Sequence, residues 1–449
     1  MHTPTPTSER FRVVGAIGAT GIIVASMVGS GIFTLTGKFG AQVGSERNVL
    51  AAWVIGGVLA LAGGLSLAEL GAMIPCSGGS VEFARRAFGR TTGYLVAMVT
   101  ILSGYFLSIA AVGLMLAEYV NKLAPEPLDL RTVAIATIVL AFLSQLPGLR
   151  AGYAFNTGLS VLKIGFVAAF VAAGLLWPLA ARVEPSAAAL EAAPGHGLFS
   201  AAVASATLSV SFAYLGWSTG ADVAGDIRDP GRNVPRAILA AIGIVFALYI
   251  GVNLVYLRVF DPLAMTEPDG TPMQAIGAVT ATQLFGDAAG RVLAGVIALL
   301  FFSTMVSGTI TAARILESMA RAGEIPPWTG ARRASGVPLR ALAVTVAASL
   351  ACLAIGNLDD IFGLLTVLVN VFSSLSVAAV MVLRRTMPDA PRPFRVPLYP
   401  FTPLLYLALA GWSIAASVAE GGWKSVIASL ATVAALLIIK PLLTLGSPR

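Results

Sequence analysis

The sequence contains very few charged residues for its length. Asp, Glu, Lys and Arg make up 11% of the 449 residues, whereas hydrophobic residues make up 57% and the mean hydropathy is +0.85. Soluble domains have about 25% charged residues. A soluble core of such low charge would leave too little polar surface to keep the chain dispersed in water. The composition excludes a soluble globular protein and predicts an all-α polytopic membrane protein.

Cysteine and histidine are almost absent. The four residues Cys76, Cys352, His2 and His196 do not have the spacing of metal ligands or of a redox pair. They also offer no nucleophile and base pair for a membrane enzyme. We therefore expect no metal, no cofactor and no enzymatic activity.

Positive charge exceeds negative charge, with a formal net charge of +7. No basic cluster lies beside aromatic residues in a soluble segment, so nucleic-acid binding is not indicated. The charges fall in short connections between apolar runs, which is typical of the positive-inside bias of membrane proteins.

Twelve apolar runs are candidates for membrane-spanning helices, which need about 20 residues each. They are 13–35, 49–74, 92–120, 132–146, 155–179, 198–223, 237–260, 292–320, 339–355, 361–383, 402–419 and 426–439.

The connections between these runs predict an orientation. Counting from an internal N-terminus puts 20 Lys and Arg inside and 8 outside, with Lys163 within a run. This asymmetry predicts that both termini are cytoplasmic. Many arginines with few lysines hint at a bacterial genome, and hence at a bacterial cytoplasmic membrane. No cleaved signal peptide is expected.

The runs also suggest how the chain is organised. A cytoplasmic tail (1–12) precedes a first five-helix half (13–179), and a second half follows (198–383). The polar stretch 261–290 is expected to form an extracellular lid of short helices. A proline-rich cytoplasmic linker (384–401) leads to two further helices and a short tail (402–449).

The first apolar run carries Gly29-Ser30-Gly31 in its second half. Glycines weaken a helix, and a backbone group freed within lipid costs several kcal/mol unless another group meets it. A break here therefore indicates a ligand. The alternative is that small residues let another helix approach closely.

The sixth run shows a similar anomaly at 211–220, where Gly216, Ser218, Thr219 and Gly220 follow Phe212. Both anomalous runs would come first in their five-helix half. Transporters with inverted repeats have discontinuous helices at corresponding positions, with helix N-termini toward anions and freed carbonyls toward cations.

Such a pair of breaks suits a zwitterion. We expect the N–H groups of Ser30, Gly31 and Ile32, next to Gly29, to bind a carboxylate. The freed carbonyls can accept hydrogen bonds from an ammonium group. These carbonyls are those of Met27, Phe212 and Leu215. Two packing helices softened by glycine remain the alternative.

Lys163 lies near the middle of the fifth run, where a charge costs about 2.5 to 3.5 kcal/mol on insertion scales. It can serve as a proton carrier or as a fixed cation in place of a bound sodium ion. The alternatives are a lysine that snorkels to the interface or one that is hydrogen-bonded to its neighbours. Ser303, Thr304 and Ser307 of the eighth run are expected to face it.

The other polar residues within the runs give weaker indications. Asp222 and Asp226 are four apart and are expected to share a helix face. Glu69 and Glu317 look structural. Trp217 is expected to border or gate the pocket beside Ser218, the alternative being a packing role.

Six short motifs occur in order along the chain. They are 29–33 (GSGIF), 68–79 (AELGAMIPCSGG), 212–217 (FAYLGW), 229–238 (DPGRNVPRAI), 319–326 (MARAGEIP) and 392–398 (RPFRVPL). Together they resemble the amino acid, polyamine and organocation transporter superfamily, nearest to its L-type amino acid transporter branch.

The resemblance implies a leucine-transporter-like fold of twelve helices, with a five-plus-five inverted repeat, discontinuous helices 1 and 6 and two extra helices. It implies the same substrate site, and it implies that Lys163 replaces a sodium ion. Leu215 and Ala221 depart from the usual Gly and Asn, so the pocket for the substrate side chain is expected to differ.

The expected function is sodium-independent secondary transport of neutral amino acids, coupled to protons or by exchange, with no obligate protein partner. The rival function is transport of polyamines or other organic cations, in which Asp222 would meet an amine. A channel or a receptor is a further alternative.

Overall fold

The structure is a computed structural model that describes residues 14–443 except 77, 147–148, 192, 194, 322, 332–337 and 420–422. The expected tail 1–12 and the basic residues 332 and 333 of the inner connections lie outside the described residues. Within the described ranges the chain is helical, with three isolated β-bridges.

In the first half of the chain, the described residues form nine helical elements. They are α1 (Ala16–Met27), α2 (Gly31–Val43), α3 (Glu46–Met73), α4 (Gly79–Phe88), α5 (Arg90–Ile101), the π-helical η2 (Leu102–Leu107), α6 (Ser108–Asn121), α7 (Leu130–Leu143) and α8 (Leu149–Leu176).

The second half follows after the short α9 (Ala187–Glu191). Its elements are α10 (Ala201–Ala213), α11 (Thr219–Asp222), η3 (Ala224–Asp226), α12 (Pro230–Val259), η4 (Pro262–Ala264), α13 (Ile276–Phe285), α14 (Asp287–Arg321), η5 (Pro327–Gly330), α15 (Leu339–Cys352), α16 (Leu358–Thr386), α17 (Phe401–Ser417) and α18 (Trp423–Leu443).

Each of the twelve apolar runs contains a helix of this fold. Among the described residues, six helices are long and apolar enough to span a membrane, and the bent pair α1–α2 makes a seventh. The remaining candidates are shorter apolar helices of 10–17 residues. The prediction of an all-helical polytopic membrane protein is confirmed.

Several boundaries differ from the predicted ones. α8 begins at Leu149 and α14 at Asp287, each earlier than the apolar run suggested, because polar residues continue the helices beyond their apolar parts. α4 was not expected; it is an amphipathic helix whose polar face carries Glu82, Arg85 and Arg86.

Side-chain caps fix several helix starts. Asp129 accepts a hydrogen bond from the Thr132 N–H (2.8 Å) at the start of α7, and Asn357 forms a capping box with Asp360 at the start of α16. Such caps satisfy backbone N–H groups that have no partner within the helix.

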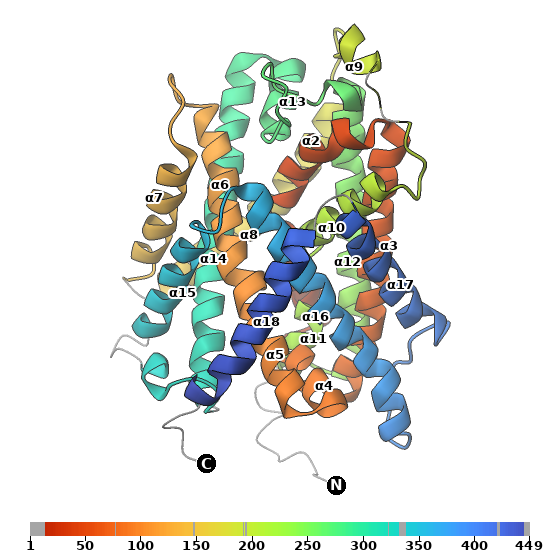
Figure 1. Cartoon of the computed structure of the whole chain (residues 1–449), viewed down its shortest axis with the longest axis vertical. Helices are drawn as coiled ribbons and strands as arrows, with labels where there is room; N and C mark the ends of the chain where they lie inside the picture. Colours follow the sequence, from red (N-terminus) through yellow and green to blue (C-terminus); the bar gives the residue numbers. More distant parts are fainter. Residues whose placement is uncertain are drawn as a thin grey trace.

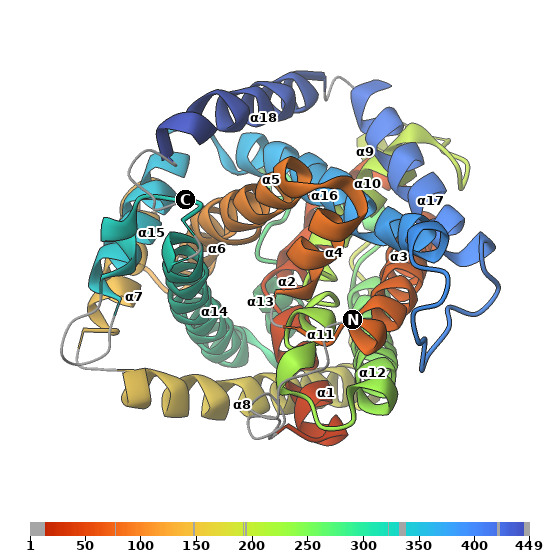
Figure 2. The ribbon, with the colours of Figure 1, turned by 90° about the horizontal axis from the view of Figure 1, so that it is seen from below.

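The helices run mostly along the long axis of the molecule (Figure 1). α9 and α13 lie at one end and α4 at the other. From below, α2, α4 and α11 lie in the middle, whereas α7, α8, α15, α17 and α18 form the rim (Figure 2). α12 packs on α3 and α1, and α10 packs on α3, α17 and α2. The interrupted helices therefore meet inside the bundle.

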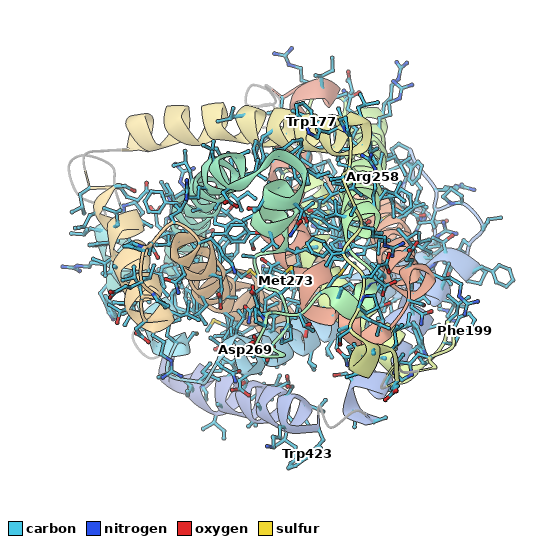
Figure 3. The ribbon with its side chains drawn as sticks, turned by 90° about the horizontal axis from the view of Figure 1, so that it is seen from above. Trp177, Phe199, Arg258, Asp269, Met273 and Trp423 are labelled. Atoms are coloured by element: carbon cyan, nitrogen blue, oxygen red, sulfur yellow. The ribbon has the colours of Figure 1, made fainter. Side chains whose placement is uncertain are left out.

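The segment 261–290 forms short helices, η4 and α13, at the end of the molecule that carries α9. Figure 3 shows Met273 near the middle of this end. The Met273 carbonyl contacts the backbone of α2 so closely that a side chain at Gly37 would overlap it. The segment covers the end of α2.

Candidate functional site

The first break separates α1 from α2. α1 ends at Met27, α2 begins at Gly31, and the two helices are bent by 42°. Between them Val28 has an extended backbone, with φ −73° and ψ 96°. The break predicted at Gly29-Ser30-Gly31 is present.

The second break follows α10, which ends at Ala213, and α11 begins at Thr219. Gly216 lies between them with φ +109°, a conformation that side chains with a Cβ rarely adopt. The predicted unwinding of the sixth run is also present.

The two breaks lie directly against each other. A Cβ atom at Gly31 would lie 2.7 Å from the Cβ and 2.9 Å from the Cα of Ala213. A Cβ at Gly216 would lie 2.7 Å from the carbonyl carbon of Ser26 and 2.9 Å from the amide nitrogen of Met27. Glycine is needed at both positions because a side chain there would overlap the backbone of the other helix. The two alternatives considered for these glycines, close packing of helices and a break in the helix, therefore both apply.

Helix ends of opposite polarity meet here. α2 starts at the junction, whereas α1 and α10 both end at it. Within the described part of the chain, the backbone N–H groups of Ser30, Gly31 and Ile32 have no acceptor. The hydroxyl of Ser30, which is 1% exposed, has no partner there either. Such an N-terminus attracts anions, and the C-terminal carbonyls attract cations.

The three predicted carbonyls differ in their surroundings. The Met27 carbonyl accepts a hydrogen bond from the Tyr249 hydroxyl (2.8 Å), and the Phe212 carbonyl accepts one from the Leu215 N–H (3.0 Å). A carbonyl oxygen has two lone pairs, so each can accept a second hydrogen bond. Phe212 and Leu215 are half-buried, whereas Met27 is buried.

A row of polar residues on α12 was not predicted from the sequence. Tyr249, Asn253 and Tyr256 follow at helical spacing and are fully buried. Tyr256 donates to the Ile32 carbonyl (3.3 Å), and the Asn253 carboxamide oxygen accepts from the Thr36 hydroxyl (2.5 Å). Their spacing on an apolar helix was the signal that could have found them.

Lys163 on α8 is buried, with 4% of its surface exposed. Its Nζ donates to the Thr304 hydroxyl on α14 over 3.0 Å. The snorkelling alternative is therefore wrong, and the predicted contact with the eighth run is made by Thr304. Ser303 is buried and Ser307 half-buried on the same helix.

The side chain of Trp217 packs away from the breaks. Its ring lies 5.9 Å from that of Tyr406 on α17 and touches Gly63 on α3. This arrangement favours the packing alternative over a gate.

Asp222 secures α4 to the second break. Its carboxylate accepts from the Ser80 N–H (2.9 Å), with Ser218 as a further hydrogen-bond partner, and its carbonyl accepts from the Gly78 N–H (2.8 Å). The prediction that Asp222 and Asp226 share a helix face is wrong, because α11 ends at Asp222 and a 3-10 turn follows.

The start of α1 is joined to the segment that follows α11. The Val14 N–H donates to the Asp226 carbonyl (3.1 Å), and the Arg228 N–H donates to the Val14 carbonyl (2.9 Å). This isolated parallel bridge between Val14 and Ile227 connects the start of α1 to the segment after α11.

The site is covered at the end toward α13. The Lys38 Nζ lies 2.5 Å from a carboxylate oxygen of Asp359 and 4.8 Å from the centre of the Phe362 ring. That ring lies 4.8 Å from the ring of Phe212, at the second break. α2 and α16 are thus held together above the site.

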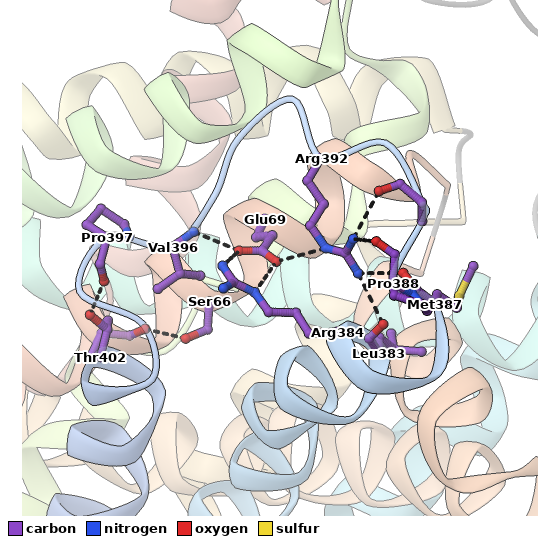
Figure 4. A network of polar contacts seen from close by, with 12 residues as sticks. Ser66, Glu69, Leu383, Arg384, Met387, Pro388, Arg392, Val396, Pro397 and Thr402 are labelled. Carbon is purple, nitrogen blue, oxygen red and sulfur yellow. Dashed lines mark hydrogen bonds and ion pairs between the residues drawn. The ribbon is translucent and has the colours of Figure 1, made fainter.

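Glu69 has a structural role, as expected. Its carboxylate is fully buried and accepts two hydrogen bonds from Arg384 (2.8 and 2.5 Å) and one from the Val396 N–H (2.7 Å). Arg392 lies 3.4 Å from the same carboxylate. Figure 4 shows how this network connects α3 to α16 and to the linker before α17.

Replacing Glu69 with glutamine is expected to destabilise the protein by about 3 kcal/mol, because two arginines would lose the buried negative charge that they share. Thermal unfolding in detergent measures the loss. Glu82→Gln is the control: Glu82 pairs with Arg86 at a half-exposed position (2.7 Å) and should cost less than about 1 kcal/mol. Equal losses in both variants would contradict the role of Glu69.

The described residues include no group of three or more His, Cys, Asp or Glu placed to hold a metal ion. The candidate site is formed by helix ends and hydroxyl groups, and Lys163 of α8 contacts α14.

Comparison with known proteins supplies the last observation. A family model for amino acid permeases matches residues 14–437. The serine/threonine exchanger SteT of Bacillus subtilis is 27% identical over 412 residues, which are 91% of this chain and 91% of that protein. The mouse large neutral amino acids transporter small subunit 2 is 28% identical, over 88% of this chain and 74% of its own length. The mouse b(0,+)-type amino acid transporter 1 is 27% identical, over 94% and 86%.

Proposed function

Because this chain belongs to the amino acid permease family, we propose that it carries out sodium-independent secondary transport of neutral amino acids by alternating access. The family makes it a multi-pass membrane transporter of amino acids and not an enzyme, as the six motifs indicated. The proposal adds the class of amino acid, the independence from sodium, the mechanism and the site.

The observation that carries the proposal is the junction of the two breaks. The start of α2 offers three backbone N–H groups and the Ser30 hydroxyl to a carboxylate. The ends of α1 and α10 offer the carbonyls of Met27 and Phe212 to an ammonium group, together with that of Leu215. The carboxylate and the ammonium group of an α-amino acid would each have complementary backbone groups at this junction.

We propose that the substrate has a neutral side chain, because neither carboxylate near the second break is available to pair with a cationic one. Asp222 caps α4 and Asp226 is exposed. This also weakens the rival function, transport of polyamines or other organic cations, which needs a carboxylate for the second amine. The names of the relatives, a serine/threonine exchanger and a large neutral amino acids transporter, support the same class.

Independence from sodium rests on Lys163. Its buried ammonium group lies between α8 and α14, where it can supply a fixed positive charge in place of a metal ion. If Lys163 releases and regains its proton in each transport cycle, transport is coupled to protons. If it keeps its proton, transport is simple exchange.

The proposed architecture has twelve spans, in which 13–179 and 198–383 form inverted five-helix halves. Both termini would be in the cytoplasm of a bacterial cell, and the lid 261–290 would face outside. The positive-inside asymmetry supports this orientation. The closed contacts of Lys38 with Asp359 and Phe362 then lie on the outer side of the site. Transport would require them to open.

Uptake into proteoliposomes tests the function. We expect saturable uptake of serine, threonine or leucine that is equal in sodium and choline buffers and is stimulated by unlabelled amino acid inside. A thermal-shift screen of amino acids and polyamines should show stabilisation by the amino acids, because a ligand stabilises the state that binds it. Stabilisation by polyamines alone would favour the rival, and conduction of ions without saturation would indicate a channel.

A further inference from the structure

A cavity of about 550 Å³ lies where the start of α12 meets the linker before α17. Its walls come from the first turns of α12 and from Pro393 and Phe394 of the linker. Two of the lining side chains, those of Arg232 and Arg236, are cationic and exposed, and that of Asp229 is anionic. A cavity of this size can hold a small organic group. Its two arginines favour a group with negative charge.

Both arginines are available to a ligand. In the part of the chain that the structure describes, neither side chain has an ion-pair or hydrogen-bond partner. The arginine at the other end of α12 differs, because Arg258 donates to the carbonyls of Gly174 (2.6 Å) and Trp177 (2.9 Å). The protein thus supplies acceptors for the arginine at one end of this helix and leaves those at the other end to an external group.

The linker wall of the cavity is held in place. A Cβ atom at Gly231 would lie 2.7 Å from the Cβ of Pro393, so the linker lies directly on the start of α12. Arg392 donates to the Met387 carbonyl (2.7 Å) and lies 3.4 Å from the carboxylate of Glu69 (Figure 4). The buried network around Glu69 therefore keeps the cavity in its shape.

The cavity lies at the depth of lipid headgroups. Residues 237–257 of α12 carry no charge and are flanked by Arg236 and Arg258. At about 1.5 Å per residue these arginines are about 33 Å apart along the helix, close to the roughly 30 Å of a hydrocarbon core. α12 is long and apolar enough to span a membrane. Arg232 and Arg236 therefore lie where its apolar span ends.

One exposed face of α12 continues from the cavity along this span. The exposed residues that share the face of Arg236 are Ala240, Gly243, Ile244, Ala247 and Leu254. None of them is polar, as expected for a surface in contact with acyl chains. The helix thus presents cationic groups at headgroup level and an apolar strip beside the hydrocarbon core, which is the order of groups in an anionic phospholipid.

We propose that the cavity binds the headgroup of an anionic phospholipid, with the phosphate at Arg232 and Arg236 and the acyl chains along the exposed face of α12. Arginine binds phosphate oxygens in a bidentate manner, and basic pockets between membrane helices bind anionic headgroups. The Asp229 carboxylate opposes the two positive charges without cancelling them. The inference requires a membrane protein and is independent of which substrate is transported.

The test is the binding of dioleoyl phosphatidylglycerol to the full chain in detergent, measured by native mass spectrometry. The wild type should bind it more tightly than dioleoyl phosphatidylcholine, which has no net charge. Replacing both arginines (Arg232→Gln with Arg236→Gln) should weaken binding at least about tenfold, because each basic residue near an anionic lipid surface contributes roughly fivefold. Asp229→Asn should bind phosphatidylglycerol at least as tightly as the wild type, because it removes the opposing charge.

Arg90→Gln with Arg385→Gln is the matched control. These arginines are also exposed, at the start of α5 and in the last turn of α16, and do not line the cavity. This variant loses the same charge, so its affinity for phosphatidylglycerol should remain within twofold of the wild type. Equal losses in the two double variants would overturn the proposal, because general attraction by the basic surface would then explain the binding.

Two comparisons of ligands decide the remaining alternatives. Phosphatidylcholine that binds the wild type as tightly as phosphatidylglycerol would overturn the anionic specificity. Glycerol 3-phosphate that raises the melting temperature as much as phosphatidylglycerol does would show a site for free phosphates and overturn the lipid. If the double variant of Arg232 and Arg236 does not fold, these comparisons and Asp229→Asn still decide. Each result is obtained without a transport assay, so a failure of the proposed function is seen separately.

Discussion

Replacing Gly31 with valine is expected to abolish saturable amino acid uptake, with a loss of at least about a hundredfold. The new Cβ would lie 2.7 and 2.9 Å from two carbon atoms of Ala213, one of them in the backbone. The clash cannot be relieved by a side-chain rotation, so the two breaks must separate. The N–H groups of α2 and the carbonyls of α1 and α10 would then no longer face one ligand. Uptake into proteoliposomes and substrate-induced thermal stabilisation measure the loss.

Gly29→Ala provides the matched control for this prediction. A Cβ at Gly29 would meet one atom within 4 Å, the Met27 carbonyl oxygen at 3.9 Å, so there is room for a methyl group. Its uptake should remain within threefold of the wild type. Both variants are compared at equal amounts of protein that elutes as a single species. Wild-type affinity in Gly31→Val would exclude the junction as the substrate site.

The second large effect is expected from Lys163→Ala. Removing the buried ammonium group deletes the positive charge between α8 and α14 and leaves the Thr304 hydroxyl without its donor. We expect uptake to fall at least about tenfold and its dependence on external pH to disappear. Uptake rates between pH 5 and pH 8 in proteoliposomes provide the measurement.

Lys424 supplies the control lysine, because it is exposed on α18. All five lysines lie in the part of the chain that the structure describes, and Lys163 is the buried one among them. Lys424→Ala should keep both the uptake rate and its pH profile. If Lys163→Ala also keeps them, this residue has no part in coupling.

The helices and the breaks could be predicted because their causes are local. Long apolar runs require helices in a membrane, and the glycines at 29, 31 and 216 weaken a helix wherever they occur. We expected the two breaks to meet because each lies in the first helix of a predicted five-helix half. Local patterns did not show how tightly they meet, and Gly31 against Ala213 is a contact between residues far apart in the chain.

The supporting residues could not be predicted, because their partners are distant in the chain. Tyr249 contacts Met27, 222 positions away, and Arg384 contacts Glu69, 315 positions away. The prediction that Asp222 and Asp226 share a helix face failed for a different reason. A spacing of four predicts a shared face only if the helix continues, and the second break leaves α11 only four residues long.

The bridge between Val14 and Ile227 limits how the two interrupted helices can move. Two backbone hydrogen bonds join the first described residue of the chain to the segment after α11, and Asp222 joins α11 to α4. An outward swing of α1 would therefore pull on α11 and on α4, unless the bridge breaks first. If the protein opens on this side, α1, α11 and α4 would have to move together, and the energetic cost would include the contacts of these helices with α3, α12 and α16.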